Sequence, residues 1–178
     1  MLKIIFETHS TTLDNEKHIS SGWYDIDLSE LGIKQSQELG ERYKNIHLDA
    51  IFCSDLQRSF KTAKIAFENC NIPIIQDLRL RECNYGDYTQ KNSDLVTKIK
   101  LNYISTPFPN GESYINTSQR IKDFLEYLIK NYDNKTIMII GHRATQYGLE
   151  HLINNIPLET IISTPWKWEP GWIYNLKN

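Results

Sequence analysis

Residues 2–10, LKIIFETHS, open the chain with an apolar run of strand length that ends in a histidine. Two later runs have the same form, AIFCS at residues 50–54 and TIMIIGH at residues 136–142. Apolar residues at helical spacing fall between and after these runs, at about 31–46, 60–70 and 114–132. Strands that alternate with helices predict parallel pairing through right-handed crossovers. We therefore expect an α/β fold, with a sheet that helices cover on both faces.

The chain has the length of one domain, and its other segments fit around the same sheet. Its 178 residues are enough to bury a substantial core. NIPIIQDL at residues 71–78 and WIYNL at residues 172–176 are expected to add strands. Residues 84–111 have weaker periodicity and contain the turn sequence PNG, which predicts an excursion over the sheet. We expect a single domain over residues 1–178, with this excursion above the functional site.

Composition and charge disfavour several classes of protein. The hydrophobic fraction of 40% and the charged fraction of 24% are those of an ordinary globular chain. The formal net charge is -2 with both signs interleaved, so nucleic acid is not an expected partner. No apolar run reaches the roughly 18 residues of a membrane span, and the first run is too short for a signal peptide. We expect a cytoplasmic protein without a membrane partner; its oligomeric state is open, with a homodimer as one alternative.

Three side chains suited to anion chemistry follow the predicted strands. The first strand ends at His9, the second leads through CSDLQR to Arg58, and the strand at residues 136–142 ends at His142. Ligands of open parallel sheets bind beyond the carboxyl ends of the strands, so these side chains are expected to meet there. Each alone is compatible with a structural or surface role, but their joint placement favours a site. Arginine offers a planar donor fork and STTLDN at residues 10–15 adds neutral donors, which suits a phosphoryl group.

Metal chemistry finds little support in the sequence. The three cysteines, Cys53, Cys70 and Cys83, form no C-x-x-C pair, so neither a disulfide framework nor a zinc knuckle is expected. Two histidines and a carboxylate could hold zinc, but no H-E-x-x-H or similar ligand spacing occurs. We therefore expect neither a metal nor another cofactor.

Six motifs follow one another along the chain. The first is THSTTLDN at residues 8–15, and the others are SGWYDIDLSELGIKQSQELG (21–40), IFCSDLQRSFKTA (51–63), RLRECNYGDY (79–88), PNGESY (109–114) and IMIIGHRAT (137–145). In this order they resemble the motifs of the histidine phosphatase superfamily, in its phosphoglycerate mutase-like branch. The likeness covers nearly the whole chain. It implies a three-layer α/β/α sandwich around a mostly parallel central sheet.

The resemblance also implies a role for each matching residue. His9 would be the nucleophile that forms a phosphohistidine, and His142 and Arg58 would clamp the phosphoryl oxygens. Asn15 would add a neutral donor. Glu82 would protonate the leaving alkoxide and then take a proton from water. Without the motif, Glu82 would be interpreted as a surface carboxylate beside two arginines, Arg79 and Arg81.

The chain departs from the family at its first motif, R-H-G-E-T-x-x-N. Thr8 replaces the arginine, Ser10 the glycine and Thr11 the glutamate. One cationic phosphate ligand is therefore missing, and the loss of a transition-state donor costs roughly a hundred- to thousandfold in rate. Arg143 follows His142 where the family commonly has glycine. Its guanidinium either reaches the pocket and replaces the charge or points to solvent, and the hydroxyls of Thr8 and Ser10 are further phosphate donors without charge.

Three functions are consistent with these motifs. The first is a metal-independent phosphatase, of low activity if the missing arginine matters, that acts on a small phosphate monoester. The second is an inactive member that binds a phosphorylated ligand, which the substitution at Thr8 favours. The third is a mutase-type phosphotransferase, which the compact chain disfavours because the mutases carry longer insertions. Trp166, Trp168 and Trp172 are expected to pack under the terminal strand, with a pocket for an aromatic leaving group as the alternative.

Overall fold

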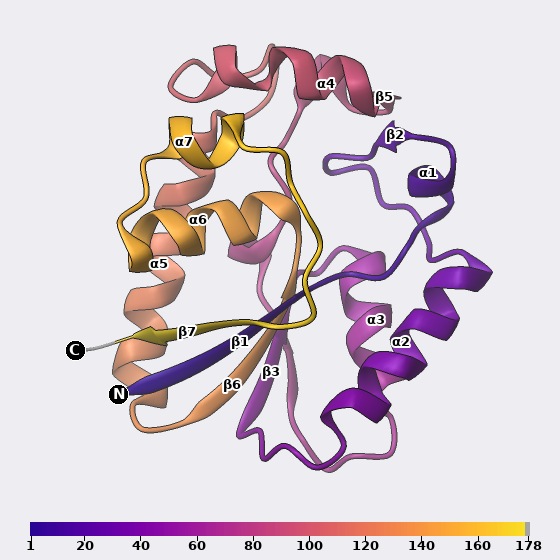
Figure 1. The fold of residues 1–178 in the computed structure, drawn as a ribbon, viewed down its shortest axis with the longest axis vertical. Helices are drawn as coiled ribbons and strands as arrows, with labels where there is room; N and C mark the ends of the chain where they lie inside the picture. The colour runs from indigo at the N-terminus through magenta and orange to yellow at the C-terminus, as the bar shows by residue number, and fades with distance from the viewer. Residues whose placement is uncertain (177–178) are drawn as a thin grey trace.

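A five-stranded sheet forms the centre of the computed structural model, which describes residues 1–176 (Figure 1). The strand order is β4-β3-β6-β1-β7. β7 pairs antiparallel with β1, and the other neighbouring pairs are parallel, so the prediction of a mostly parallel sheet is confirmed. The strands are β1 (Leu2–Thr8), β3 (Ala50–Cys53), β4 (Ile74–Gln76), β6 (Thr136–Gly141) and β7 (Trp172–Leu176).

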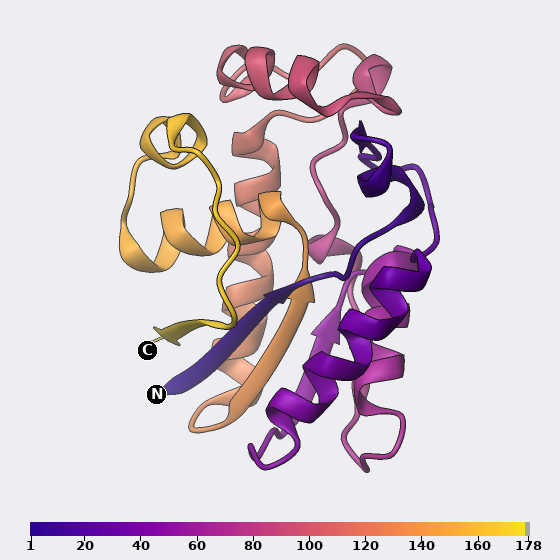
Figure 2. The same cartoon turned by 45° about the vertical axis from the view of Figure 1, so that its right-hand side comes forward.

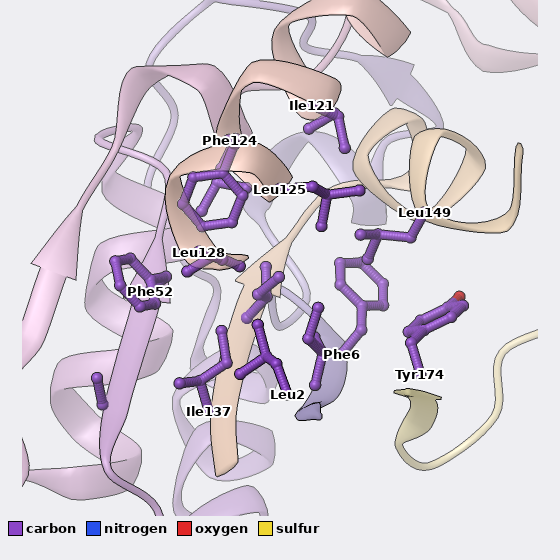
Figure 3. Packing of buried hydrophobic residues seen from close by; sticks show 14 residues of the cluster. Leu2, Phe6, Phe52, Ile121, Phe124, Leu125, Leu128, Ile137, Leu149 and Tyr174 are labelled. Carbon is purple, nitrogen blue, oxygen red and sulfur yellow. The ribbon is translucent and has the colours of Figure 1, made fainter. Parts of the chain in front are cut away.

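Alternation along the strands divides the core into two layers. Phe6 and Ile139 pack on one face with α5 (Tyr114–Tyr132), where Figure 3 shows Phe124 and Leu128 over the sheet. Ile5 packs on the other face with α2 (Glu30–Tyr43) and α3 (Gln57–Phe67). Successive side chains of a strand point to opposite faces, so each central strand contributes to both layers. The fold is the expected three-layer α/β/α sandwich.

The helices differ in places from the sequence prediction. α2 and α3 end at Tyr43 and Phe67, so Ile46 and Cys70 lie beyond them and are exposed. α6 (Arg143–Asn154) and α7 (Leu158–Ser163) were not predicted. Within residues 1–176, no helix combines the length and apolar character that crossing a membrane requires.

Residues 84–111 form a roof at the end of the molecule towards which β1 and β6 run (Figure 2). Phe108 and Ile104 of this segment pack with Tyr147 of α6 in a separate apolar cluster. The roof is also tied to the first loop, because β2 pairs antiparallel with β5. The elements of the roof are η2 (Gly86–Tyr88), β5 (Lys91–Asn92), α4 (Ser93–Ile99) and η3 (Lys100–Tyr103). The short elements outside the roof are α1 (Leu13–Glu16), β2 (Ile19–Ser20) and η1 (Leu78–Leu80).

Candidate active site

A cavity of about 660 Å³ lies between the carboxyl ends of the strands and the roof. Its walls come from the loop after β1, from α2 and α3, from the roof, from the start of α6 and from the connection between α7 and β7. The residues of this wall that the sequence predicted as site residues are Thr8, His9, Ser10, Asn15, Arg58, Glu82 and Arg143.

His9 enters the cavity directly after β1, where its backbone N–H donates to the carbonyl of Gly141 at 2.9 Å. Its Nδ1 lies 2.7 Å from the carbonyl oxygen of Ser10. Because a carbonyl only accepts, Nδ1 carries the proton and Nε2 keeps its lone pair. Burial, reinforced by the charge of Arg58, lowers the pKa of His9 to about 3. The imidazole is therefore neutral at pH 7 and available as a nucleophile.

α2 and α3 fix the loop that follows His9. The backbone N–H of Ser10 donates to Thr62 Oγ1 at 3.0 Å, and Ser36 Oγ donates to Ser10 Oγ at 2.9 Å. Gly32 allows α2 to approach, because a Cβ at this position would lie 2.0 Å from the carbonyl oxygen of Thr11. The loop is thus held by hydrogen bonds and close packing, so the direction of the His9 ring is set by both helices.

Asn15 and Thr8 lie on opposite sides of His9 in the sequence, and both line the cavity. Asn15 Oδ1 accepts from the backbone N–H of Thr12, while the side chain of Thr12 accepts from the N–H of Asn15. This capping box engages the amide oxygen and leaves the amide NH₂ as a donor. Thr8 is half-buried and brings a hydroxyl but no charge.

Arg58 brings a buried positive charge to the site. The guanidinium is 2% exposed and donates to the carbonyls of Gly22 at 2.7 Å and Tyr24 at 3.0 Å. Among residues 1–176, no carboxylate forms an ion pair with it. Burial lowers the pKa of this group, although arginine stays charged at any physiological pH. Glu82 and Asp25 act on this charge without pairing with it, so the guanidinium keeps donors for an anion in the cavity.

His142 lies behind His9 rather than in the cavity wall. Its ring is fully buried, with its centroid 5.0 Å from that of His9. Nε2 lies 2.6 Å from Ser54 Oγ, whereas Nδ1 has no hydrogen-bond partner among the described residues. Burial and the charge of Arg58 lower the pKa of His142 well below its usual range. The proton of the neutral ring lies on Nδ1 when Ser54 donates to Nε2, and on Nε2 when Ser54 accepts.

Glu82 is buried at the cavity wall, with 8% of its surface exposed. Its Oε1 accepts from the backbone N–H groups of Cys83 at 2.7 Å and Ala144 at 3.2 Å. The neighbouring arginines pair elsewhere, Arg79 with Asp77 and Arg81 with Asp55. The interpretation of Glu82 as a surface carboxylate paired with these arginines is therefore wrong.

Arg143 is exposed and also lines the cavity. Its guanidinium lies 4.7 Å from the ring centroid of Trp166, in stacking range. Trp166 and Trp168 line the same cavity. Trp166 also packs against the terminal strand, with its ring centroid 6.1 Å from that of Trp172. The expectation that the tryptophans pack under this strand is therefore wrong for Trp168, which is 48% exposed. That expectation holds for Trp172, whose ring centroid lies 5.7 Å from that of Phe6 in the core. Without packing information, the sequence alone did not separate these tryptophans.

Sequence reasoning missed four charged residues of the cavity wall, Glu7, Glu38, Arg42 and Lys100, of which Glu7 and Lys100 are buried. Lys100 is 8% exposed, and the signal was its position in IKL, between two apolar residues of the roof. Glu7 is 1% exposed and accepts from Arg42 and Tyr43, both at 2.7 Å. Its signal was a carboxylate inside an otherwise apolar strand. Burial raises the pKa of Glu7, although both partners oppose the shift.

The fold and the site together define the class of the protein. A mostly parallel sheet flanked by helices, as in the phosphoglycerate mutase-like α/β proteins, carries a neutral histidine, a second histidine and a buried guanidinium at one edge. The family model of the histidine phosphatase superfamily (branch 1) matches residues 4–171. The chain belongs to this superfamily.

Relatives of known name support this assignment. Phosphoserine phosphatase 1 of Hydrogenobacter thermophilus is 31% identical over 153 residues, covering 80% of this chain and 71% of its own. The 2,3-bisphosphoglycerate-dependent phosphoglycerate mutase of Chlamydia pneumoniae is 27% identical over 218 residues, covering 100% and 95%. Among solved structures, Bacillus stearothermophilus YhfR superposes with a TM-score of 0.87 at 26% identity, covering 99% and 92%.

Proposed function

We propose that this protein is a metal-independent phosphatase that hydrolyses a small phosphate monoester through a phosphohistidine on His9. The observation that carries the proposal is the fixed tautomer of His9, with Nδ1–H bound to the Ser10 carbonyl and a lone pair on Nε2. The similarity to a phosphoserine phosphatase, at 31% identity, supports hydrolysis of a phosphomonoester. The interleaved charges and net charge of -2 support a small substrate rather than nucleic acid, and the free cysteines a cytoplasmic setting.

In the first step, the lone pair of His9 Nε2 attacks phosphorus in line with the leaving oxygen. An N–P bond forms, and the bond from phosphorus to the ester oxygen breaks. The charge of the three equatorial oxygens is stabilised by Arg58 and the amide of Asn15 in the cavity wall, and by His142 from its place behind His9. The buried guanidinium and the unpartnered Nδ1 support these roles, because both have hydrogen-bonding capacity left for an anion.

Glu82 is the proton donor and acceptor of this proposal. It gives a proton to the departing alkoxide and then takes one back from the water that attacks the phosphohistidine. The N–P bond breaks, inorganic phosphate leaves and neutral His9 is restored. Oε1 accepts two backbone N–H groups, which leaves Oε2 to exchange the proton.

Arg143 replaces the charge that the family's first arginine provides. Two observations support this role. Arg143 lines the cavity beside His9, and its charge contributes to the lowered pKa of His9 after burial and Arg58. Trp166 stacks against the guanidinium at 4.7 Å and limits its freedom. Thr8 and Ser10 supply hydroxyls to the same phosphoryl group.

The relative from Chlamydia pneumoniae makes a mutase the second candidate. Its alignment spans 218 residues, more than the 178 residues of this chain, so the mutase carries insertions that this chain lacks. A mutase must retain a doubly phosphorylated intermediate, whereas a shorter chain exposes the phosphoenzyme to water. This difference favours hydrolysis over transfer.

Phosphate release from a panel of small phosphomonoesters, with EDTA present, tests the proposal. We expect hydrolysis by the wild type and a loss of at least about 10³-fold in kcat in His9→Ala, because the nucleophile is gone. His47→Ala is the matched control, since His47 is 84% exposed and outside the cavity. A labelled substrate should leave an acid-labile phosphoenzyme in the wild type and in His47→Ala, but not in His9→Ala.

Other results would select the alternatives. Binding of phosphomonoesters that depends on Arg58, without turnover or phosphoenzyme, would establish the inactive binding protein. Transfer of label from one hydroxyl to another of the same substrate, in place of release to water, would establish the mutase. Hydrolysis that EDTA abolishes would contradict the metal-independent mechanism.

A further inference from the structure

Lys100 is a buried lysine on the roof side of the cavity. It begins η3, directly after α4, and 8% of its surface is exposed. Its Nζ donates to the hydroxyl of Tyr147 at 3.4 Å and lies 5.7 Å from the centroid of that ring. Both Lys100 and Tyr147 line the cavity. The Lys100 side chain thus forms part of the wall of the space that the substrate would fill.

No carboxylate of residues 1–176 forms an ion pair with Lys100. A buried ammonium with one neutral partner is costly, because lysines in interiors are ordinarily paired. The cost is raised by Arg143, a second cation of the same cavity. Burial and this neighbouring charge lower the pKa of Lys100. An arrangement of two cations without a counter-ion is expected where a ligand supplies the negative charge.

The phosphoryl group does not account for both cations. The floor of the cavity is the side formed by the loops after the strands and by the helix starts that follow them. For the phosphoryl group it already offers Arg58, the unpartnered Nδ1 of His142 and the amide of Asn15. Arg143 lines the same cavity as His9 and Lys100, and its charge acts on both. Lys100 therefore belongs to the part of the cavity that the leaving group occupies.

We propose that Lys100, with the hydroxyl of Tyr147, forms a subsite for a second anionic group of the substrate, a carboxylate or a second phosphate. The inference rests on the proposed phosphatase function and narrows it. The substrate class is a phosphomonoester whose alcohol part carries its own acidic group. Neutral or cationic alcohol parts leave the Lys100 ammonium without a counter-ion and are poor substrates.

Matched substrate pairs test the subsite in the wild type. O-phosphoserine and O-phosphoethanolamine differ by one carboxylate, and propane-1,3-diol bisphosphate and 3-hydroxypropyl phosphate differ by one phosphate. We expect kcat/KM to favour the acidic member by about 10- to 100-fold, mostly through KM, as for hydrogen bonds to charged groups. The pair with the larger ratio identifies whether the second anion is a carboxylate or a phosphate.

Lys100→Met tests the residue, because methionine keeps the length of the side chain and removes the charge. It should lower kcat/KM by about 10- to 100-fold for the acidic member and by less than about threefold for the neutral one. Lys98→Met removes an exposed lysine of the preceding helix, α4, outside the cavity, and should leave both values unchanged. If Lys100→Met fails to fold, Lys100→Arg should fold and keep the preference.

Binding to His9→Ala, followed by calorimetry, gives a result that does not depend on turnover. Tighter binding of the acidic members to this variant, lost in His9→Ala/Lys100→Met, supports the subsite even if no ester is hydrolysed. Equal binding and equal kcat/KM within each pair would overturn the subsite and leave the phosphatase proposal intact. Absence of His9-dependent hydrolysis together with selective binding would contradict the phosphatase proposal alone.

Discussion

The floor and the roof of the cavity are held by different kinds of contact. On the floor, His9 and Arg58 bind backbone carbonyls, and Glu82 accepts from backbone N–H groups. On the side towards the roof, Arg143 at the start of α6 stacks on Trp166, and Lys100 of the roof has one hydroxyl partner. Backbone groups at strand ends are fixed by the sheet, whereas side-chain stacking in connections depends on a few atoms.

This difference separates chemistry from selectivity. Substitutions on the floor should reduce turnover of every substrate, because they act on the phosphoryl group that all substrates share. Substitutions on the roof should change which alcohol part is accepted, because that part lies beyond the phosphoryl group. Binding loops that are positioned by a rigid scaffold are a general feature of proteins.

The largest effect is expected for Arg58→Met. Removing the buried cation should lower kcat by about 10²- to 10³-fold with p-nitrophenyl phosphate and O-phosphoserine alike. Lys61→Met, on the same helix, removes a half-exposed charge paired with Asp27 and is the control. Steady-state kinetics measures both variants, and a loss confined to one substrate would contradict the assignment of Arg58 to the floor.

The proton affinity of His9 gives the second test. Its pKa is lowered to about 3, so NMR titration of its ring should show a neutral imidazole throughout pH 5–8. The signal is assigned by its loss in His9→Gln. Because the folded-state pKa lies below that of the unfolded chain, this contribution to stability is complete above about pH 6.5 and is lost as the pH falls towards 3. A midpoint near 6.5 would disprove the buried, neutral nucleophile.

Arg143 lies where floor and roof meet, and a smaller effect is expected there. Arg143→Met should lower kcat by about 10- to 100-fold, since a charged donor is lost from the phosphoryl group. Thr8→Arg added to this variant should recover part of the rate by returning a guanidinium to the family's position. Stopped-flow measurement of phosphate release follows both changes. An unchanged rate in Arg143→Met would mean that the Arg143 guanidinium points to solvent and does not contact the phosphoryl group.

The floor could be predicted from the sequence because strand ends are local signals. An apolar run that stops at a histidine places His9 or His142 at the sheet edge, whatever else the chain does. The sequence did not reveal that His142 is buried behind His9, because depth depends on packing. α6 was also missed. Its first half, residues 144–149, is buried without interruption, so no polar stripe marks its period.

The roof and the segment of Trp166 and Trp168 were harder to predict, because the roles of these residues depend on tertiary contacts. Lys100 has no motif, and its burial depends on the apolar cluster around Phe108. Trp166 and Trp168 stand in the same short segment as Trp172, yet only Trp172 lies in β7 and contacts Phe6 of the core. Composition marks all three tryptophans as packing residues, and the topology decides which of them face a ligand.

The smallest effect is expected at the rim, for Trp168→Ala. Trp168 is 48% exposed and contacts Arg42, whose guanidinium carbon lies 5.6 Å from its ring centroid. Its removal should leave the free energy of unfolding within about 0.5 kcal/mol and change KM by less than about fivefold. Trp172→Ala is the contrasting variant and should lose roughly 1–3 kcal/mol of stability, because it opens the contact with Phe6. Urea denaturation separates them, and equal losses would mean that Trp168 is a core residue rather than part of the cavity rim.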